Sequence, residues 1–407
     1  MDEYSLRLEK QRAKKELGMK ILFLNWNSFG NEDIIPAFRE LKHEVIVHPF
    51  AKIVSVHDAE WEKGFTATLR AHVPDFVFSF AYFPIVSKVC QAEGILYVSW
   101  VYDSPHVALY SYTMINSCNR VFIFDKELCL SFIRSGFKNV FYLPMAANTS
   151  RLDAMLEAQS PDVISRYSSD ISLVGSLYSE PKHNLYSRIT SIRPYVKGYL
   201  DALIQAQMMV YGYNFIEEAL TPQIIEELLQ SDYSMRPSPT GVESSEYLYA
   251  QYVLNRHVTS LEREKILRLL GQLTTVDLYT HDSSVRMEGV RNHGPVDYYD
   301  TMPYVFNNSK INLNISLRSI QSGIPLRAFD IMGCGGFLLS NYQADFLDFF
   351  VPGEDFVFYD NIEQVKDLAA YYLAHDDERE AIRKCGHRKI QCGHTYKHRL
   401  EEIFSVL

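Results

Sequence analysis

The segment 309–341, SKINLNISLRSIQSGIPLRAFDIMGCGGFLLSN, holds the densest group of residues that could bind an anion. Ser322 and Gly323 precede Pro325, an order typical of a helix N-terminus that follows a strand and a polar loop. The free N–H groups of such a terminus, together with the helix dipole, favour an anion such as a diphosphate. The spacing therefore predicts an anion site where this helix begins.

Three charged side chains could complete that site. Arg318 and Arg327 can add charge-assisted hydrogen bonds to phosphate oxygens. Asp330 falls one to two turns into the expected helix, where a carboxylate could accept hydrogen bonds from two ribose hydroxyls. A capped helix that carries a surface Asp has the same spacing, so the pattern alone does not separate a binding site from a structural one.

A second group follows an expected strand in the first half of the chain. Asp103 comes directly after the strand and is a candidate general base toward an acceptor hydroxyl, or an anchor for that acceptor. His106 is the alternate candidate. The structural alternative for Asp103 is an Asx turn before proline. Asn27, in the first strand–helix loop, could approach the same ligands or serve only as a turn residue.

Near-continuous apolar segments alternate with helical ones and position these loops. Strands are expected at 20–25, 44–48, 75–80, 95–100 and 120–124, and then at 171–174, 276–280, 310–316, 337–340 and 356–359. Between the two sets, the polar stretch 148–169 is a candidate hinge, and helices are expected over 182–195 and, with a loop, over 197–272. The fold class is therefore α/β with two Rossmann-like, doubly wound domains that face a central cleft. Ligands of such sheets bind at the carboxyl ends of the strands.

Composition and missing motifs exclude several classes of protein. The 407 residues are 47% hydrophobic and 22% charged, and a net charge of −10 argues against a general nucleic-acid binder. The charged first residues resemble no signal peptide, and no apolar run is long enough to cross a membrane, so a cytoplasmic location without an integral membrane segment is expected. The six cysteines form no CxxC pair, and no zinc spacing, DxD, GxGxxG, GK[ST] or HExxH motif is present. Metal-bridged, nicotinamide, P-loop and zincin chemistries are therefore disfavoured.

Several of these segments together resemble one known group of proteins. SKINLN and GIPLRAFDIMGCGGFLLSN resemble the C-terminal domain of the CgeB-like (spore-maturation protein type) glycosyltransferases, which are related to the retaining GT-B superfamily. The stretches ISLVGSLY, VDLYTHDSS and GPV in the second half resemble the same family. NWNSFG and YVSWVYDSP in the first half are similar to its partner domain. The resemblance spans about residues 19–400 and is most specific in the second half.

The resemblance implies a domain plan. An N-terminal helical extension would occupy 1–18 and an acceptor-binding domain 19–165. A nucleotide-sugar domain would occupy 166–385, with the helical insertion at about 197–272. The last helix, 386–407, would cross back to the first domain. The oligomeric state is left open.

The resemblance also implies roles for single residues. Asp330 matches the position where the superfamily usually has a ribose-binding Glu, and Ser322 stands where another Glu often lies beside the transferred sugar. Gly175 and Ser176 would lie under the diphosphate, with Ser322, Gly323, Arg318 and Arg327 as further donor contacts. The remaining candidate positions for donor or acceptor loops are Asn27, His281 and Asn314.

The expected activity is transfer of a sugar from a nucleoside-diphosphate sugar, by default UDP-linked, to an acceptor hydroxyl. The acceptor could be a glycan, a protein or a small molecule. No metal and no cofactor are expected to be required, and a retaining outcome is favoured; an inverting one would use Asp103 as base. Two alternatives remain: a nucleotide-sugar isomerase or hydrolase of the same fold, and a non-catalytic sugar-binding or assembly protein.

Overall fold

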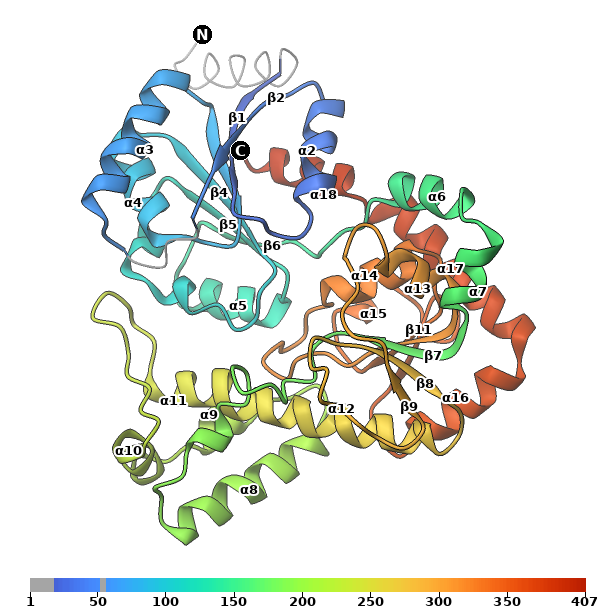
Figure 1. Ribbon diagram of the computed structural model, residues 1–407. Helices are drawn as coiled ribbons and strands as arrows, with labels where there is room; N and C mark the ends of the chain where they lie inside the picture. The colour runs from blue at the N-terminus through green and yellow to red at the C-terminus, as the bar shows by residue number, and fades with distance from the viewer. Residues whose placement is uncertain (1–17, 52–55) are drawn as a thin grey trace.

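The computed structural model describes residues 18–51 and 56–407 and consists of two domains and a helical insertion (Figure 1). The expected extension at 1–18 lies, apart from its last residue, outside the described residues. Each domain is built on a six-stranded sheet whose strands are all parallel. The predicted α/β class with two doubly wound domains is confirmed.

The N-terminal sheet has the strand order β2-β1-β3-β4-β5-β6. Every residue of β3 is buried, as expected for a strand that is covered on both faces by helices. Its strands are β1 (Lys20–Asn25), β2 (Glu44–Pro49), β3 (Phe76–Phe80), β4 (Leu96–Val101), β5 (Asn119–Ile123) and β6 (Val140–Tyr142). Its helices are α2 (Asn31–Glu40), α3 (Ala59–His72), α4 (Pro84–Glu93) and α5 (Lys126–Arg134).

The C-terminal sheet has the order β12-β11-β10-β7-β8-β9. Its strands are β7 (Ser169–Val174), β8 (Val276–Tyr279), β9 (Val290–Asn292), β10 (Ser309–Asn314), β11 (Leu338–Asn341) and β12 (Val357–Tyr359). Its helices are α13 (Met302–Asn308), α14 (Leu326–Gly333), α15 (Phe346–Phe349), α16 (Gln364–Ala374) and α17 (Asp376–Gly393). The three-residue strands β6 and β9 were not predicted, whereas β12, of the same length, was.

The expected hinge at 148–169 is not an irregular segment. It forms α6 (Thr149–Glu157) and α7 (Pro161–Tyr167). The Asn148 side chain accepts from the Arg151 N–H, and the Ser160 hydroxyl accepts from the Val163 N–H. These polar residues are helix caps.

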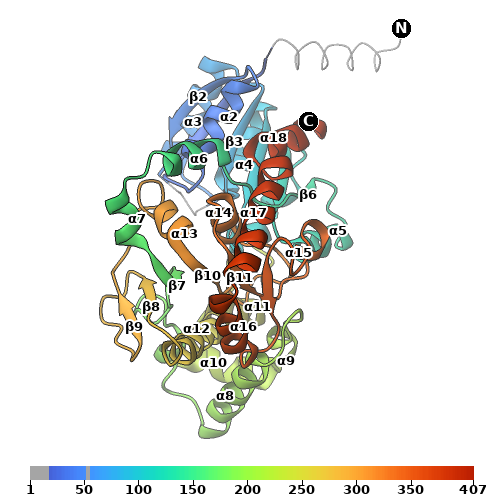
Figure 2. The ribbon, with the colours of Figure 1, turned by 90° about the vertical axis from the view of Figure 1, so that its right-hand side faces the viewer.

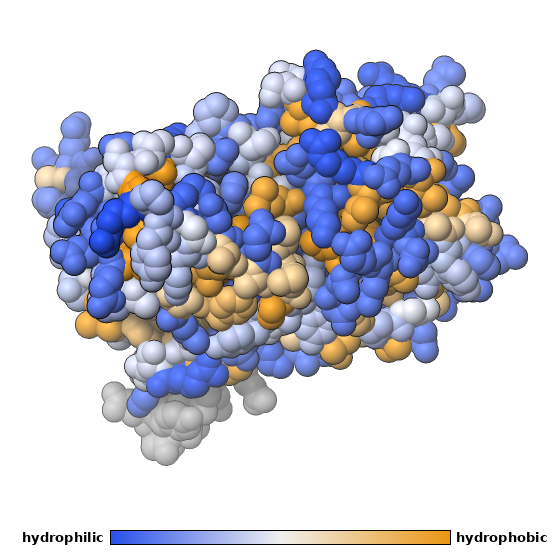
Figure 3. All heavy atoms as spheres, turned by 90° about the horizontal axis from the view of Figure 1, so that it is seen from below, coloured by the Kyte–Doolittle hydropathy of each residue, from blue (hydrophilic) through white to orange (hydrophobic). Residues whose placement is uncertain are grey.

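The insertion forms a separate lobe below the two sheets in Figure 1. It comprises α8 (Pro194–Met208), α9 (Ile216–Ala219), α10 (Pro222–Gln230), α11 (Ser245–Leu248) and α12 (Asn255–Gly271), around a hydrophobic core of its own. The helix expected over 182–195 is absent from the structure, where a short 3-10 turn occupies Tyr186–Arg188. Figure 3 views the molecule from the insertion side and shows hydrophobic and hydrophilic residues interspersed there.

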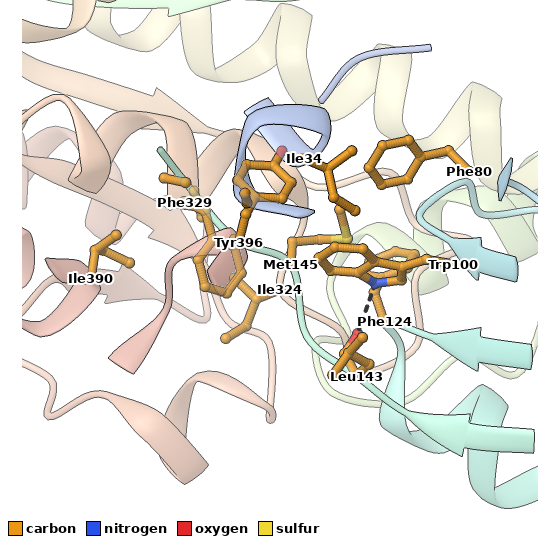
Figure 4. Packing of buried hydrophobic residues seen from close by; sticks show 14 of the residues in the cluster. Ile34, Phe80, Trp100, Phe124, Leu143, Met145, Ile324, Phe329, Ile390 and Tyr396 are labelled. Atoms are coloured by element: carbon orange, nitrogen blue, oxygen red, sulfur yellow. Dashed lines mark hydrogen bonds between the residues drawn. The ribbon is translucent and has the colours of Figure 1, made fainter. Parts of the chain in front are cut away.

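The last helix, α18 (Tyr396–Ser405), leaves the C-terminal domain and packs against α2 of the N-terminal domain (Figures 1 and 2). The break between α17 and α18 falls at residues 394–395, inside the range predicted to cross back. Residues of both domains form one continuous core here, including Trp100, Met145, Phe329 and Tyr396 (Figure 4). Among the described residues, no helix combines the length and the apolarity that a membrane span requires.

Candidate active site in the interdomain cleft

A cleft of about 840 Å³ lies between the two domains, where the carboxyl ends of β1, β7 and β8 meet. This is the edge at which open α/β sheets bind ligands. Of the residues predicted from the sequence, the cleft brings together Asn27, Gly175, Ser176, His281 and Arg327. The other predicted residues do not line it.

The N-terminal wall is the loop between β1 and α2, followed by the exposed face of α2. Asn27 is exposed and adopts φ 60, a left-handed conformation that Asn tolerates better than most residues. Gly30 ends the loop at φ 85, and a Cβ there would lie 2.7 Å from the Tyr396 hydroxyl oxygen, so only glycine fits. Beyond it, Glu32 and Arg39 of α2 face the cleft.

The C-terminal wall is formed by the turns after β7 and β8. The Ser176 hydroxyl donates to the buried carboxylate of Glu180, with O–O distances of 2.9 and 3.0 Å. The Ser176 carbonyl accepts from the Arg263 guanidinium. His281 is exposed at the end of β8. Since its hydroxyl and carbonyl are engaged, Ser176 shapes this wall through its fixed backbone.

Asp330 lies behind the cleft and is covered by Tyr298. The Tyr298 hydroxyl donates to the Asp330 carboxylate at 2.7 Å, and Phe29 packs on the Tyr298 ring with centroids 4.6 Å apart. Burial raises the pKa of Asp330 to about 6, against the opposing charge of Arg327, whose Nη1 lies 3.5 Å away. A ribose that bound the carboxylate oxygen facing Tyr298 would have to replace the Tyr298 hydroxyl.

The predicted anion site at Ser322 and Gly323 is already filled by a carboxylate of the other domain. The Asp125 side chain accepts from the N–H groups of Gln321 and Ser322, at 2.6 and 3.2 Å, and from the Ser322 hydroxyl at 3.1 Å. A Cβ on Gly323 would lie 2.8 Å from the Asp125 Cα. This differs from the sequence expectation: the loop before α14 is a docking surface between the domains.

Arg318 and Asn314 also have internal partners. Arg318 Nε donates to the fully buried carboxylate of Glu262 at 2.8 Å, and its guanidinium stacks over the Tyr211 ring at 3.9 Å. Asn314 is buried and donates to the Ser340 hydroxyl at 2.9 Å. Neither faces the cleft, because the chain turns away from it after β10.

Asp103 and His106 lie on the N-terminal domain beside the insertion. The charge of Asp103 adds to burial in raising the pKa values of Tyr102 and Tyr252, and the latter reaches about 12. His106 Nε2 lies 3.0 Å from the Tyr82 carbonyl oxygen. This part of the structure places both residues outside the cleft lining.

Sequence reasoning missed the aromatic and charged residues that line the cleft most prominently. They are Phe29, Glu32, Arg39, Tyr298 and Tyr299. The spacing of Glu32, Pro36 and Arg39 follows one helical face, which was a readable signal. The pair at 298–299 follows the GPV segment at 294–296 after one residue, Asp297. The Tyr299 hydroxyl accepts from the Gly30 N–H at 2.9 Å and so joins the two walls.

Within residues 18–51 and 56–407, no group of three or more His, Cys, Asp or Glu side chains is arranged to hold a metal ion. The free thiols of Cys385 and Cys392 are both exposed.

A model of a glycosyl transferase-like family matches residues 256–405, from α12 to α18. A glycosyltransferase from Rickettsia africae is 9% identical and superposes with a TM-score of 0.55 over 96% of this chain and 97% of its own. Anabaena HepE, solved in complex with UDP and glucose, is 10% identical and superposes with a TM-score of 0.51 over 96% of this chain and 100% of its own. Sucrose-phosphate synthase from Thermosynechococcus elongatus is 8% identical and superposes with a TM-score of 0.54 over 95% of this chain and 98% of its own. The fold is GT-B.

The search of curated proteins found no match to the chain. In this GT-B structure, the segment that the family model matches supplies His281, Tyr298 and Arg327, which lie on the C-terminal side of the cleft. The β1–α2 loop on the opposite side lies outside that segment.

Proposed function

We propose that the chain is a glycosyltransferase that moves a sugar from a nucleoside-diphosphate sugar to an acceptor hydroxyl. The observation that carries the proposal is the cleft itself, which collects loops from the carboxyl ends of both parallel sheets in a GT-B fold. The match of residues 256–405 to a glycosyl transferase-like family supports it. A UDP-linked donor is the specific form, supported by the UDP and glucose bound in the structurally similar HepE.

In this proposal, the C-terminal wall of the cleft binds the donor and the N-terminal wall binds the acceptor. His281 and Tyr298 offer ring faces and polar atoms to a nucleoside, and Arg327 offers charge to its phosphates. Phe29 and Glu32 on the other wall face the position that an acceptor would occupy. Glu32 is an exposed carboxylate and can accept hydrogen bonds from sugar hydroxyls.

In the reaction, the bond between the anomeric carbon and the phosphate oxygen breaks, and its electron pair stays on the diphosphate. The acceptor oxygen forms the new bond to the anomeric carbon and gives up its proton. Nearby cations stabilise the charge that develops on the leaving diphosphate. We propose that no metal is needed and that the anomeric configuration is retained. Asp103, the base that an inverting reaction was expected to use, does not line the cleft.

A thermal-shift screen against UDP, GDP, dTDP and their sugars tests donor binding. A ligand at about 100 times its Kd stabilises the fold by about 2.7 kcal/mol. Ligands that bind are then incubated with candidate acceptors, with and without EDTA, and the product anomer is read by NMR. Absence of binding by every nucleotide contradicts the proposal, while loss of turnover in EDTA contradicts only its metal-free form.

A second candidate is a non-catalytic nucleotide-sugar binder. The coverage of Asp330 by Tyr298 and the filling of the Ser322 loop by Asp125 favour it. Such a protein would show the same thermal shift, but it would consume no donor with any acceptor.

A further inference from the structure

One arginine of the insertion, Arg256, makes no ion pair with any residue that the structure describes. The Arg256 guanidinium lies over the Tyr178 ring at 5.7 Å. Its Nε is buried, and within the described part of the chain that atom has no hydrogen-bond partner. A buried donor without an acceptor carries a desolvation cost of its own. An anion that reached Arg256 would remove that cost.

The neighbouring arginines are different, because each is already engaged. Arg263, two turns further along α12 and also against Tyr178, donates to the carbonyls of Ser176 and Ile315. Arg268, at the end of α12, pairs with Glu264 at 2.8 Å. Among the arginines of the described α12, Arg256 is thus the one with a buried donor left unpaired.

Other cationic groups gather at the same place. Burial lowers the pKa of His183, and the charges of Arg256, Lys182 and His281 lower it further, so these groups lie within electrostatic reach of one another. Tyr178, against which Arg256 packs, lies two residues after Ser176 of the cleft lining, and this contact places Arg256 at the edge of the cleft. The negative charge of Glu180 acts on His183 in the opposite direction, and its carboxylate also accepts from the Ser176 hydroxyl.

We propose that Arg256, assisted by Lys182, forms an anion subsite that binds a phosphoryl group at the insertion side of the cleft. A planar guanidinium suits two phosphate oxygens, and the Tyr178 ring holds it in orientation. The anion is either the diphosphate of the donor or a phosphate carried by the acceptor. The inference rests on the proposed glycosyltransferase function only where it names the donor diphosphate and an acceptor phosphate as the two possible anions.

The test compares Arg256→Gln with Arg268→Gln, an exposed arginine on the same helix. Titration calorimetry measures binding of UDP, of uridine, and of inorganic pyrophosphate in the presence of saturating uridine. A charge-assisted contact to the donor makes Arg256→Gln bind UDP about tenfold or more weakly, with uridine unchanged. A contact to an acceptor phosphate leaves UDP unchanged and weakens pyrophosphate instead. Arg268→Gln should match the wild type throughout.

The outcomes separate this inference from the proposed function. If Arg256→Gln binds both UDP and pyrophosphate like the wild type, or if the wild type binds neither, the subsite does not exist. If pyrophosphate binds through Arg256 but no nucleotide binds, the subsite stands and the transferase proposal falls. Should Arg256→Gln fail to fold, Arg256→Lys and Lys182→Gln replace it, and unchanged binding in both would overturn the inference.

Discussion

Two loops at the same edge of the C-terminal sheet differ in what occupies them. The turn after β7, at Gly175 and Ser176, faces the open cleft. The loop after β10, up to Pro325, is sealed against the N-terminal domain, with Asp125 bound to its backbone N–H groups. Both follow buried parallel strands, so the position at a strand end brings loops together without deciding which of them stays available to a ligand.

In the sealed loop, other residues of the protein already supply partners for the backbone N–H groups and for the arginine. Its N–H groups attract a carboxylate of the other domain, and its arginine is neutralised by Glu262. The open side holds cations whose charge is only partly balanced, Arg327 and Arg256. The comparison predicts that substitutions on the sealed side change stability, whereas those on the open side change binding.

The largest effect is expected for Arg318→Ala. It leaves the Glu262 carboxylate, which is fully buried, without its ion-pair partner, and breaking a buried pair in this way costs about 3–5 kcal/mol. Chemical denaturation measures the loss in free energy of unfolding. Arg268→Ala, in an exposed pair, should change it little. If Arg318→Ala is as stable as the wild type but no longer binds nucleotide, Arg318 is a ligand-binding residue and not a structural one.

A smaller loss is expected for Asp125→Ala. The substitution leaves the N–H groups of Gln321 and Ser322 without an acceptor at a buried interface, which costs roughly 2–3 kcal/mol. The melting temperature and the denaturant midpoint should both fall. Asp348→Ala, in an exposed pair with Lys126, is the control. If Asp125→Ala instead gains affinity for pyrophosphate at unchanged stability, the loop is an anion site that Asp125 merely blocks.

The sequence predicted the fold well, because alternation of buried strands and helices is a local signal. It predicted ten of the strands at nearly their observed bounds and missed β6 and β9. The helix expected over 182–195 is absent, although Leu185, Ile189 and Ile192 follow a helical spacing. Pro194 instead begins the next helix, α8.

The site was predicted less well, because partners far apart in the sequence decide it. Nothing near Ser322 indicates that Asp125, almost 200 positions earlier, will fill its backbone N–H groups. Arg318 looks like a phosphate ligand until Glu262 is found beside it. The residues expected at the ends of β1, β7 and β8 line the cleft, because strand ends alone place them there, and their roles toward a ligand stay predictions.

On the open side, Arg327→Gln is expected to weaken UDP binding by about tenfold. It also removes the cation beside the buried Asp330 carboxylate, but the Tyr298 hydroxyl remains as a partner, so the loss in free energy of unfolding should be smaller than for Arg318→Ala. Calorimetric titration with UDP gives the affinity. Arg134→Gln, on the distant α5 and paired with Glu127 at the surface, is the matched control. Equal affinity in the wild type and Arg327→Gln would remove this residue from the proposed donor site.

The smallest effect is a pH dependence that comes from Asp330. Burial raises its pKa to about 6, and a ribose that replaces the Tyr298 hydroxyl would bind the ionised carboxylate. UDP affinity should therefore rise about fourfold from about pH 5.5 to about pH 7.5, as the ionised fraction grows. The contribution to stability has the opposite sign. The folded state binds this proton more tightly than the unfolded chain, so the free energy of unfolding falls as pH rises from about 4 to about 6.

These opposite slopes make Asp330→Asn a sharp test. The variant removes the titrating carboxylate, so the part of the pH dependence that comes from Asp330 should disappear from both its affinity and its stability. UDP titrations of both proteins at the two pH values measure the first effect, and thermal melts across the range measure the second. An unchanged affinity slope in Asp330→Asn would mean that the nucleotide never reaches the carboxylate behind Tyr298. The ligand-accessible region would then end at the ring of Tyr298, and Asp330, like Arg318, would have a structural role and no role in binding.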